Sequence, residues 1–75
     1  FAMINTKEYT DDIVRKLTAE RKKQKITQQQ IADLIGMKAP NVTRVEACKH
    51  ITSLDVILKY ADAVGKKIVI TIEDK

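Results

Sequence analysis

The chain has 75 residues, 44% hydrophobic and 32% charged, and its formal net charge is +4. The length excludes several domains and leaves room for one small core, while the composition excludes a disordered chain. One cysteine excludes an internal disulfide, and no apolar run approaches the ~20 residues of a membrane span, so we expect one cytoplasmic domain over residues 3–75.

The first apolar pattern with helical spacing is Ile13, Val14 and Leu17. Just before it, the run Thr10–Asp12 supplies cap and dipole signals for the start of a helix. We therefore predict a first helix over residues 11–23.

A second helix is predicted to follow a capping box, because Thr27 and Gln30 have the required spacing. Gly36 has the position of a left-handed residue that stops this helix. The apolar face between these two signals consists of Ile31, Leu34 and Ile35.

A third helix is predicted over residues 38–46, where Val42 and Val45 keep a helical spacing. Pro40 stands about two residues inside its start. Proline costs little there, because amide hydrogens in a first helical turn have no acceptor within the helix. Pro40 is therefore compatible with the beginning of this helix.

A fourth helix is predicted to start after Thr52 or Ser53 and to end at Gly65. It carries the clearest apolar stripe in the chain, which consists of Leu54, Ile57, Leu58, Ala61 and Val64.

The last segment, residues 67–73, has the alternation of a β-strand, with Ile68, Ile70 and Ile72 on one side. No other segment has a strand pattern, and a lone strand leaves backbone groups unpaired along both edges. We expect the same strand of a second copy as the partner, which makes the protein a homodimer. A frayed or helical tail, or pairing with the stretch near Ile4, are the alternatives.

Positive charge is concentrated in the middle of the chain. Residues 15–49 contain nine basic and three acidic residues, a local balance of +6, and the remainder carries −2. This concentration of positive charge in one part of the chain is typical of a protein that binds a polyanion. Ordinary solvated lysines on helix faces would explain the charge equally well.

Two short helices joined by a glycine-containing turn, residues 27–46, have the arrangement of a helix-turn-helix. Their sequence, ITQQQIADLIGMKAPNVTRVE, resembles the helix-turn-helix of the Xre/Cro, or lambda-repressor-like, family. The residues that carry this resemblance are Thr27, Gln28, Ala32, Gly36, Arg44 and Glu46. The likeness extends over about residues 14–65 and implies a mainly α fold of four or five helices, with the third helix in the DNA major groove.

The resemblance implies that the outward side of the third helix faces bases through Ala39, Pro40, Asn41 and Arg44. Arg44 suits the edge of guanine and Asn41 that of adenine. Ala39 or Pro40 would touch a thymine methyl group.

The phosphate contacts expected around this helix are Thr27, Gln28, Lys38, Thr43, Lys49 and His50. Gln28 corresponds to a family glutamine that binds a phosphate at a helix N-terminus, where free amide hydrogens also attract an anion. Such contacts position the protein but do not read sequence.

Arg21 and Glu46 resemble a family ion pair that joins the first helix to the end of the third. Both interrupt apolar stripes, where a lone charge is costly and a paired one is tolerated. The chain departs from the family at Lys38, which replaces the usual Ser or Thr cap, and at Cys48, which replaces a glycine.

These features predict a sequence-specific regulator of double-stranded DNA, a repressor that binds a palindromic operator as a homodimer. Two alternatives stay open. The end of the chain, LKYADAVGKKIVITIE, is similar to the end of host-inhibition-of-growth antitoxins, which bind their own operator and also a cognate ribonuclease toxin. The other alternative is a protein-interaction adaptor that has lost DNA binding.

An enzyme is not expected, because one histidine and no acid–base pattern offer no catalytic pair. Cys48 and His50 would give zinc two ligands where it prefers four. We therefore expect no metal site and no other cofactor.

Overall fold

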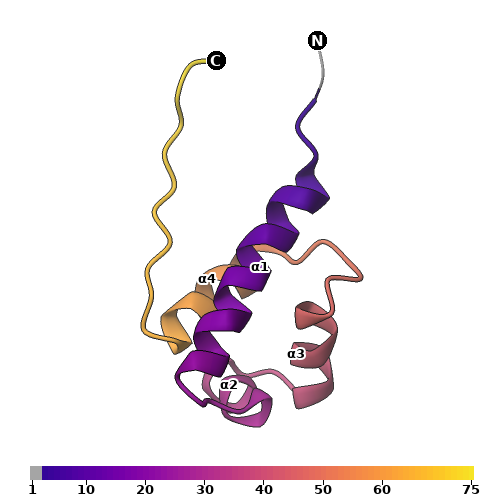
Figure 1. Ribbon diagram of the computed structural model, residues 1–75, viewed down its shortest axis with the longest axis vertical. Coiled ribbons are helices and arrows are strands. Elements are labelled where there is room, and N and C mark those ends of the chain that lie inside the picture. Colours follow the sequence, from indigo (N-terminus) through magenta and orange to yellow (C-terminus); the bar gives the residue numbers. More distant parts are fainter. Residues whose placement is uncertain (1–2) are drawn as a thin grey trace.

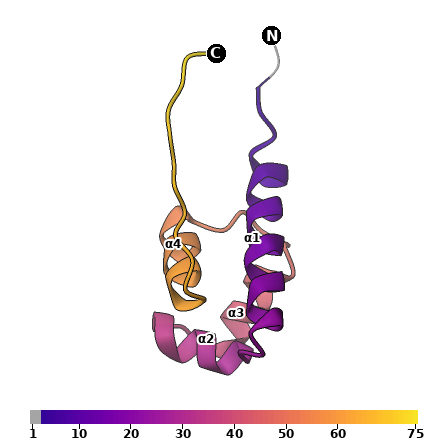
Figure 2. The ribbon, with the colours of Figure 1, turned by 60° about the vertical axis from the view of Figure 1, so that its left-hand side comes forward.

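A computed structural model describes residues 3–75; residues 1 and 2, which the predicted domain leaves out, lie outside it. The four helices are α1 (Thr6–Lys23), α2 (Gln28–Ile35), α3 (Ala39–Glu46) and α4 (Leu54–Ala63). The long helix α1 packs against α3 and α4, and α2 packs against the same two helices near the end of α1 (Figures 1 and 2). The predicted mainly α fold of four helices is confirmed.

Helix α1 begins five residues earlier than predicted. The Asn5 side chain accepts a hydrogen bond of 3.0 Å from the Glu8 amide and caps the helix there. Asp11, predicted to lie at the start, is instead buried within the helix, with 6% of its surface exposed. The apolar pattern did not predict this first turn and a half, because residues 6–9 are exposed and make no contact with the core.

The helix-turn-helix segment follows its capping and turn signals, but the predicted apolar face of α2 is only partly right, because Leu34 is exposed. Thr27 and Gln30 form both hydrogen bonds of the capping box, of 3.0 and 2.8 Å. Gly36 has a φ of 72°, in the left-handed region, and no atom lies within 4 Å of a Cβ added there. Its requirement for glycine is therefore conformational rather than steric.

Pro40 lies in the first turn of α3, as predicted, and does not break the chain. Lys38 is the N-cap residue and makes no side-chain hydrogen bond to the helix. The helix is held instead by its backbone, with Asn41 N–H bonded to the Lys38 carbonyl at 2.9 Å, and by Val42, which is 1% exposed.

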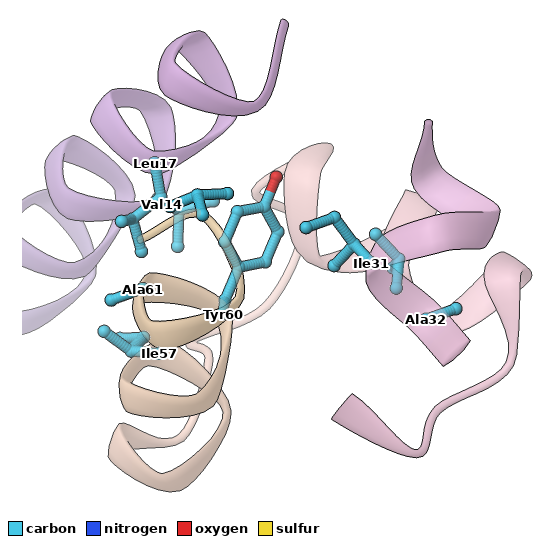
Figure 3. Packing of buried hydrophobic residues seen from close by; sticks show 9 residues of the cluster. Val14, Leu17, Ile31, Ala32, Ile57, Tyr60 and Ala61 are labelled. Atoms are coloured by element: carbon cyan, nitrogen blue, oxygen red, sulfur yellow. The ribbon is translucent and has the colours of Figure 1, made fainter. Parts of the chain in front are cut away.

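Ser53 caps α4 through a hydrogen bond of 3.3 Å from the Val56 amide. The predicted apolar stripe is only partly right, because Leu54 and Leu58 are exposed. Tyr60 takes their place in the core. Its ring lies between the α1 side chains and Ile31, and its hydroxyl points away from α4 (Figure 3). The buried apolar cluster consists of Val14, Leu17, Ile31, Ala32, Val42, Ile57, Tyr60, Ala61 and Val64.

The structure has no strand over residues 67–73, so the predicted C-terminal strand is not supported in the single chain. This tail runs beyond the helices without secondary structure (Figure 1), and the described residues contain no strand with which it could pair. Ile68 packs against the core, while Ile70 and Ile72 are 60% and 98% exposed. The physical reason is that strand hydrogen bonds need a second strand, which one copy does not provide.

Candidate nucleic-acid interface

The outward side of α3 carries three of the four residues expected to read bases. Pro40, Asn41 and Arg44 are exposed, and Asn41 and Arg44 are one helical turn apart on the same side. Ala39 is half-buried and packs against the core, so only part of its surface is available. The opposite side of α3 is fixed by the buried Val42. A rigid helix therefore presents a guanidinium and an amide to solvent.

Asn41, Arg44 and His50 also line one shallow hollow beside α3. The loop of residues 47–53, which joins α3 to α4, forms its other wall with Ile51, Thr52 and Ser53. His50, expected from sequence to contact phosphate, is thus brought next to the two polar residues of the exposed α3 face.

Gln28 is held in place by two hydrogen bonds to α3. Its Oε1 accepts a bond of 2.7 Å from the Thr43 hydroxyl, and its Nε2 donates a bond of 2.9 Å to Glu46 Oε1. A primary amide has two N–H donors, so one remains for another acceptor. The side chain is therefore oriented before any ligand arrives, and Thr43 is its partner.

Glu46, at the end of α3, joins side chains from all four helices. It forms a two-bond ion pair with Arg21 of α1, with N···O distances of 2.7 and 2.8 Å. The Tyr60 hydroxyl of α4 donates to it at 2.6 Å, and Gln28 of α2 donates as described. Arg21 also donates to the Ile26 carbonyl at 2.8 Å. This cluster fixes the angle of α3 relative to the other helices.

Burial raises the pKa of Glu46, but hydrogen bonds from Arg21, Tyr60 and Gln28 outweigh it and leave that pKa below its ordinary value. The hydrogen bond with Glu46 raises the pKa of Arg21. Burial and the Glu46 carboxylate raise the pKa of Tyr60 from 10.0 to about 12. At neutral pH the cluster is therefore a carboxylate, a guanidinium and a phenol.

The raised pKa of Tyr60 makes folding stability depend on alkaline pH. A folded-state pKa above the unfolded one gives stability that is full below pH 10.0 and lost as the pH rises toward about 12. We expect Tyr60→Phe to lower the free energy of unfolding by about 1.5–3 kcal/mol at neutral pH, because a hydrogen bond to a charged group is lost. Its stability should then fall less steeply in that alkaline window. Urea unfolding at a series of pH values tests this, and equal slopes in both proteins would contradict it.

The remaining residues expected to contact phosphate surround α2 and α3. Lys38 lies at the start of α3 and Lys49 in the loop that follows it. Both are exposed, and within residues 3–75 neither side chain makes a hydrogen bond or ion pair that would restrain it. The Thr27 hydroxyl already accepts the capping bond, which leaves its own hydrogen as a donor. Their phosphate roles stay predictions.

Sequence reasoning missed several contacts near this surface, and two of them involve residues to which it gave no functional role. The apolar stripe predicted for the fourth helix left out Tyr60, whereas its ring lies in the core and its hydroxyl donates to Glu46. Sequence reasoning gave Lys7 no role, whereas its ammonium reaches the backbone of the loop after α3. The burial of Tyr60 could have been predicted, because it lies three residues after Ile57 on α4. Nothing in the sequence indicated the contact between Lys7 and Cys48, which are 41 residues apart.

Within residues 3–75, no three His, Cys, Asp or Glu side chains are grouped as metal ligands would be. None of the helices described has the length and hydropathy needed to cross a membrane. Both statements concern this part of the chain alone.

Residues 17–70 match the family model described as helix-turn-helix. The chain belongs to this helix-turn-helix family. The match starts in the middle of α1 and includes α2, α3 and α4, so the resemblance to Xre/Cro helix-turn-helix proteins is confirmed. The helix-turn-helix family comprises DNA-binding regulators and is not an enzyme family.

This helix-turn-helix chain is also similar to a curated protein named Antitoxin HicB 1, from Photorhabdus laumondii. The two are 37% identical over 49 residues, which cover 65% of the chain and 32% of the relative. The chain therefore spans about a third of the length of that relative.

Proposed function

We propose that this helix-turn-helix chain is a sequence-specific regulator of double-stranded DNA that represses transcription as a homodimer. The observation that carries the proposal is the exposed pair Asn41 and Arg44 on a helix whose opposite side is fixed by Val42 and Glu46. Sequence reading needs donors and acceptors at defined positions in the major groove, and a rigid helix provides them.

In this proposal Arg44 pairs with a guanine edge and Asn41 with an adenine edge, while Pro40 and the exposed part of Ala39 touch a thymine methyl. Gln28, oriented by Thr43 and Glu46, offers its remaining N–H to a phosphate beside the first turn of α2. The phosphate contacts that complete the surface are Thr27, Lys38, Lys49 and His50. Thr43 acts through Gln28 instead, because its one hydroxyl hydrogen is already donated to Gln28 Oε1.

Selection of bound sequences from a random duplex pool tests this function, since it returns both specificity and half-site spacing. We expect a palindrome whose half-sites are about one helical turn apart. Gel-shift titration of the selected duplex should also show affinity that weakens as salt rises, because phosphate contacts release counterions. No enrichment over random duplex, together with no salt dependence, would leave the adaptor alternative instead.

For the homodimer, the contact we propose is pairing between the tails of two copies, residues 67–73. The support is the exposure of the β-branched residues Val69, Ile70 and Ile72 on a segment whose backbone has no strand partner in one copy. Pairing would place Ile68, Ile70 and Ile72 of each tail on one side of a two-stranded ribbon.

A chain shortened after Lys66 tests this contact. We expect the full chain to sediment as a dimer and the shortened chain as a monomer, because the truncation removes the proposed strand and leaves all four helices. A full chain that carries Ile70→Asp and Ile72→Asp should change from dimer to monomer in the same way, and it keeps the tail at its full length. An unchanged dimer mass after truncation would show that the copies meet elsewhere.

A second candidate function is that of an antitoxin, which binds a cognate toxin protein as well as its own operator. The observation that favours it is the similarity to the protein named Antitoxin HicB 1. A small gene beside the one encoding this chain, whose product is toxic alone and harmless when both are expressed, would support the antitoxin. Absence of any such neighbour would favour the free-standing repressor.

A further inference from the structure

The first turn of α1 is joined to the loop after α3 by a charged contact. Lys7 Nζ lies 2.6 Å from Asp11 Oδ2 and 2.7 Å from the backbone carbonyl oxygen of Cys48. The Asp11 side chain is 9% exposed, so the carboxylate that anchors the ammonium has little contact with water. We call these three residues the α1–loop clasp. It lies partly outside residues 17–70, the part that matches the helix-turn-helix family.

The clasp acts where the backbone changes direction. Cys48 has a φ of 56°, in the left-handed region that residues with a side chain rarely adopt. Its amide donates to the Val45 carbonyl at 3.1 Å, and its own carbonyl receives the Lys7 ammonium. A charge-assisted bond to this carbonyl therefore opposes relaxation of the turn to a more ordinary conformation.

Lys49 and His50 follow this turn directly, and both are exposed. The directions in which their side chains point depend on the Cys48 conformation, because the φ and ψ of Cys48 set the direction of the backbone that follows. His50 also lines the hollow that contains Asn41 and Arg44. Any freedom at Cys48 thus moves two expected phosphate contacts relative to α3.

We propose that Lys7 and Asp11 are positioning residues for DNA binding, which hold the loop of residues 47–53 so that Lys49 and His50 meet phosphates while α3 lies in the groove. This inference rests on the proposed DNA binding. Lys7 and Asp11 need not touch DNA themselves; they act through the Cys48 carbonyl.

The alternative, that Lys7 binds DNA as a simple positive charge, predicts the opposite sign for one substitution. Asp11→Ala removes a negative charge, which would strengthen binding to a polyanion if only charge mattered. If the clasp positions the loop, Asp11→Ala weakens binding instead, because Lys7 loses its anchor. Asp12→Ala is the matched control, since Asp12 pairs with Lys16 one turn away and both side chains are mostly exposed.

A second pair of variants tests Lys7 itself. Lys7→Met and Lys16→Met remove the same charge from the same helix, but only the first breaks the contact with Cys48. With the duplex selected by the unchanged chain, we expect Lys7→Met to bind at least about fivefold more weakly than Lys16→Met, because two phosphate contacts lose their position. Asp11→Ala should bind about threefold more weakly than Asp12→Ala on the same ground. Thermal unfolding followed by circular dichroism identifies a temperature at which all four variants are folded.

A measurement without DNA separates this inference from the proposed function. Backbone NMR order parameters of residues 48–51 in the free protein should fall in Lys7→Met and Asp11→Ala and stay unchanged in Lys16→Met and Asp12→Ala. Unchanged order parameters, or equal DNA affinities within each matched pair, would overturn the positioning role. Failure of the unchanged chain to bind any duplex would overturn the DNA-binding function and, with it, the use that we assign to the clasp.

Discussion

Arg21→Met is expected to lower the free energy of unfolding by about 3–5 kcal/mol, because it leaves a buried carboxylate without its cation. The side chains of Arg21 and Glu46 are only 10% and 7% exposed. Water therefore cannot replace the two hydrogen bonds that the guanidinium makes to Glu46, nor the one it makes to the Ile26 carbonyl. For a domain of this size such a loss is a large part of the total stability. Urea unfolding followed by circular dichroism measures it.

The matched control is Lys59→Met, because Lys59 and Asp55 form an exposed ion pair, with side chains 56% and 70% exposed. It should change stability by less than about 0.5 kcal/mol. Arg21→Met combined with Glu46→Leu should be more stable than Arg21→Met alone, since no unpaired charge is then buried. That comparison stays informative if the single variant is unfolded. A loss from Arg21→Met no greater than that from Lys59→Met would show that the buried pair does not hold the helices together.

The helix-turn-helix itself could be predicted from sequence because its signals are local. The capping box at Thr27 and Gln30, the left-handed Gly36 and the proline in the first turn of α3 each act within a few residues. Signals of this kind depend on residues that are close in sequence, and here they agree with the tertiary packing, so the fold did not alter them.

The two ends of the chain were predicted less well for a common reason. The start of α1 is set by Asn5, whose cap lies outside the apolar stripe from which helices were recognised. The tail has strand-forming residues but no strand in one copy, since its backbone partner has to come from elsewhere. Apolar periodicity indicates which residues are suited to an element, whereas caps and partners decide whether and where it forms.

The polar cluster around Glu46 shows what sequence reasoning can and cannot find. The resemblance pointed to Arg21 and Glu46 as a pair. It did not indicate that Tyr60 donates to the same carboxylate, or that Gln28 is bonded to it as well as being a candidate phosphate ligand. Those contacts join residues 14 and 18 positions apart, and they depend on how four helices meet. The same bonds link the stability of the core to the orientation of a DNA-facing side chain.

Arg44→Lys should lower affinity for the selected duplex by about 5- to 150-fold, which corresponds to the ~1–3 kcal/mol of one good base contact. Lysine keeps the positive charge but loses the planar fork that binds two acceptors of guanine at once. Affinity for a random duplex should therefore change little. Gel-shift titration of both duplexes with both proteins, at one salt concentration, gives the ratio of affinities that measures sequence reading.

Lys49→Gln supplies the contrast, because Lys49 is exposed in the loop after α3 and is expected to contact phosphate. It should weaken binding to the selected and the random duplex by a similar factor and reduce the salt slope by about 0.9. The two variants thus separate two kinds of contact on neighbouring parts of one surface. If Arg44→Lys weakened both duplexes equally, Arg44 would be a phosphate ligand. Sequence reading by α3 would then depend on Asn41 and the thymine contacts of Ala39 and Pro40.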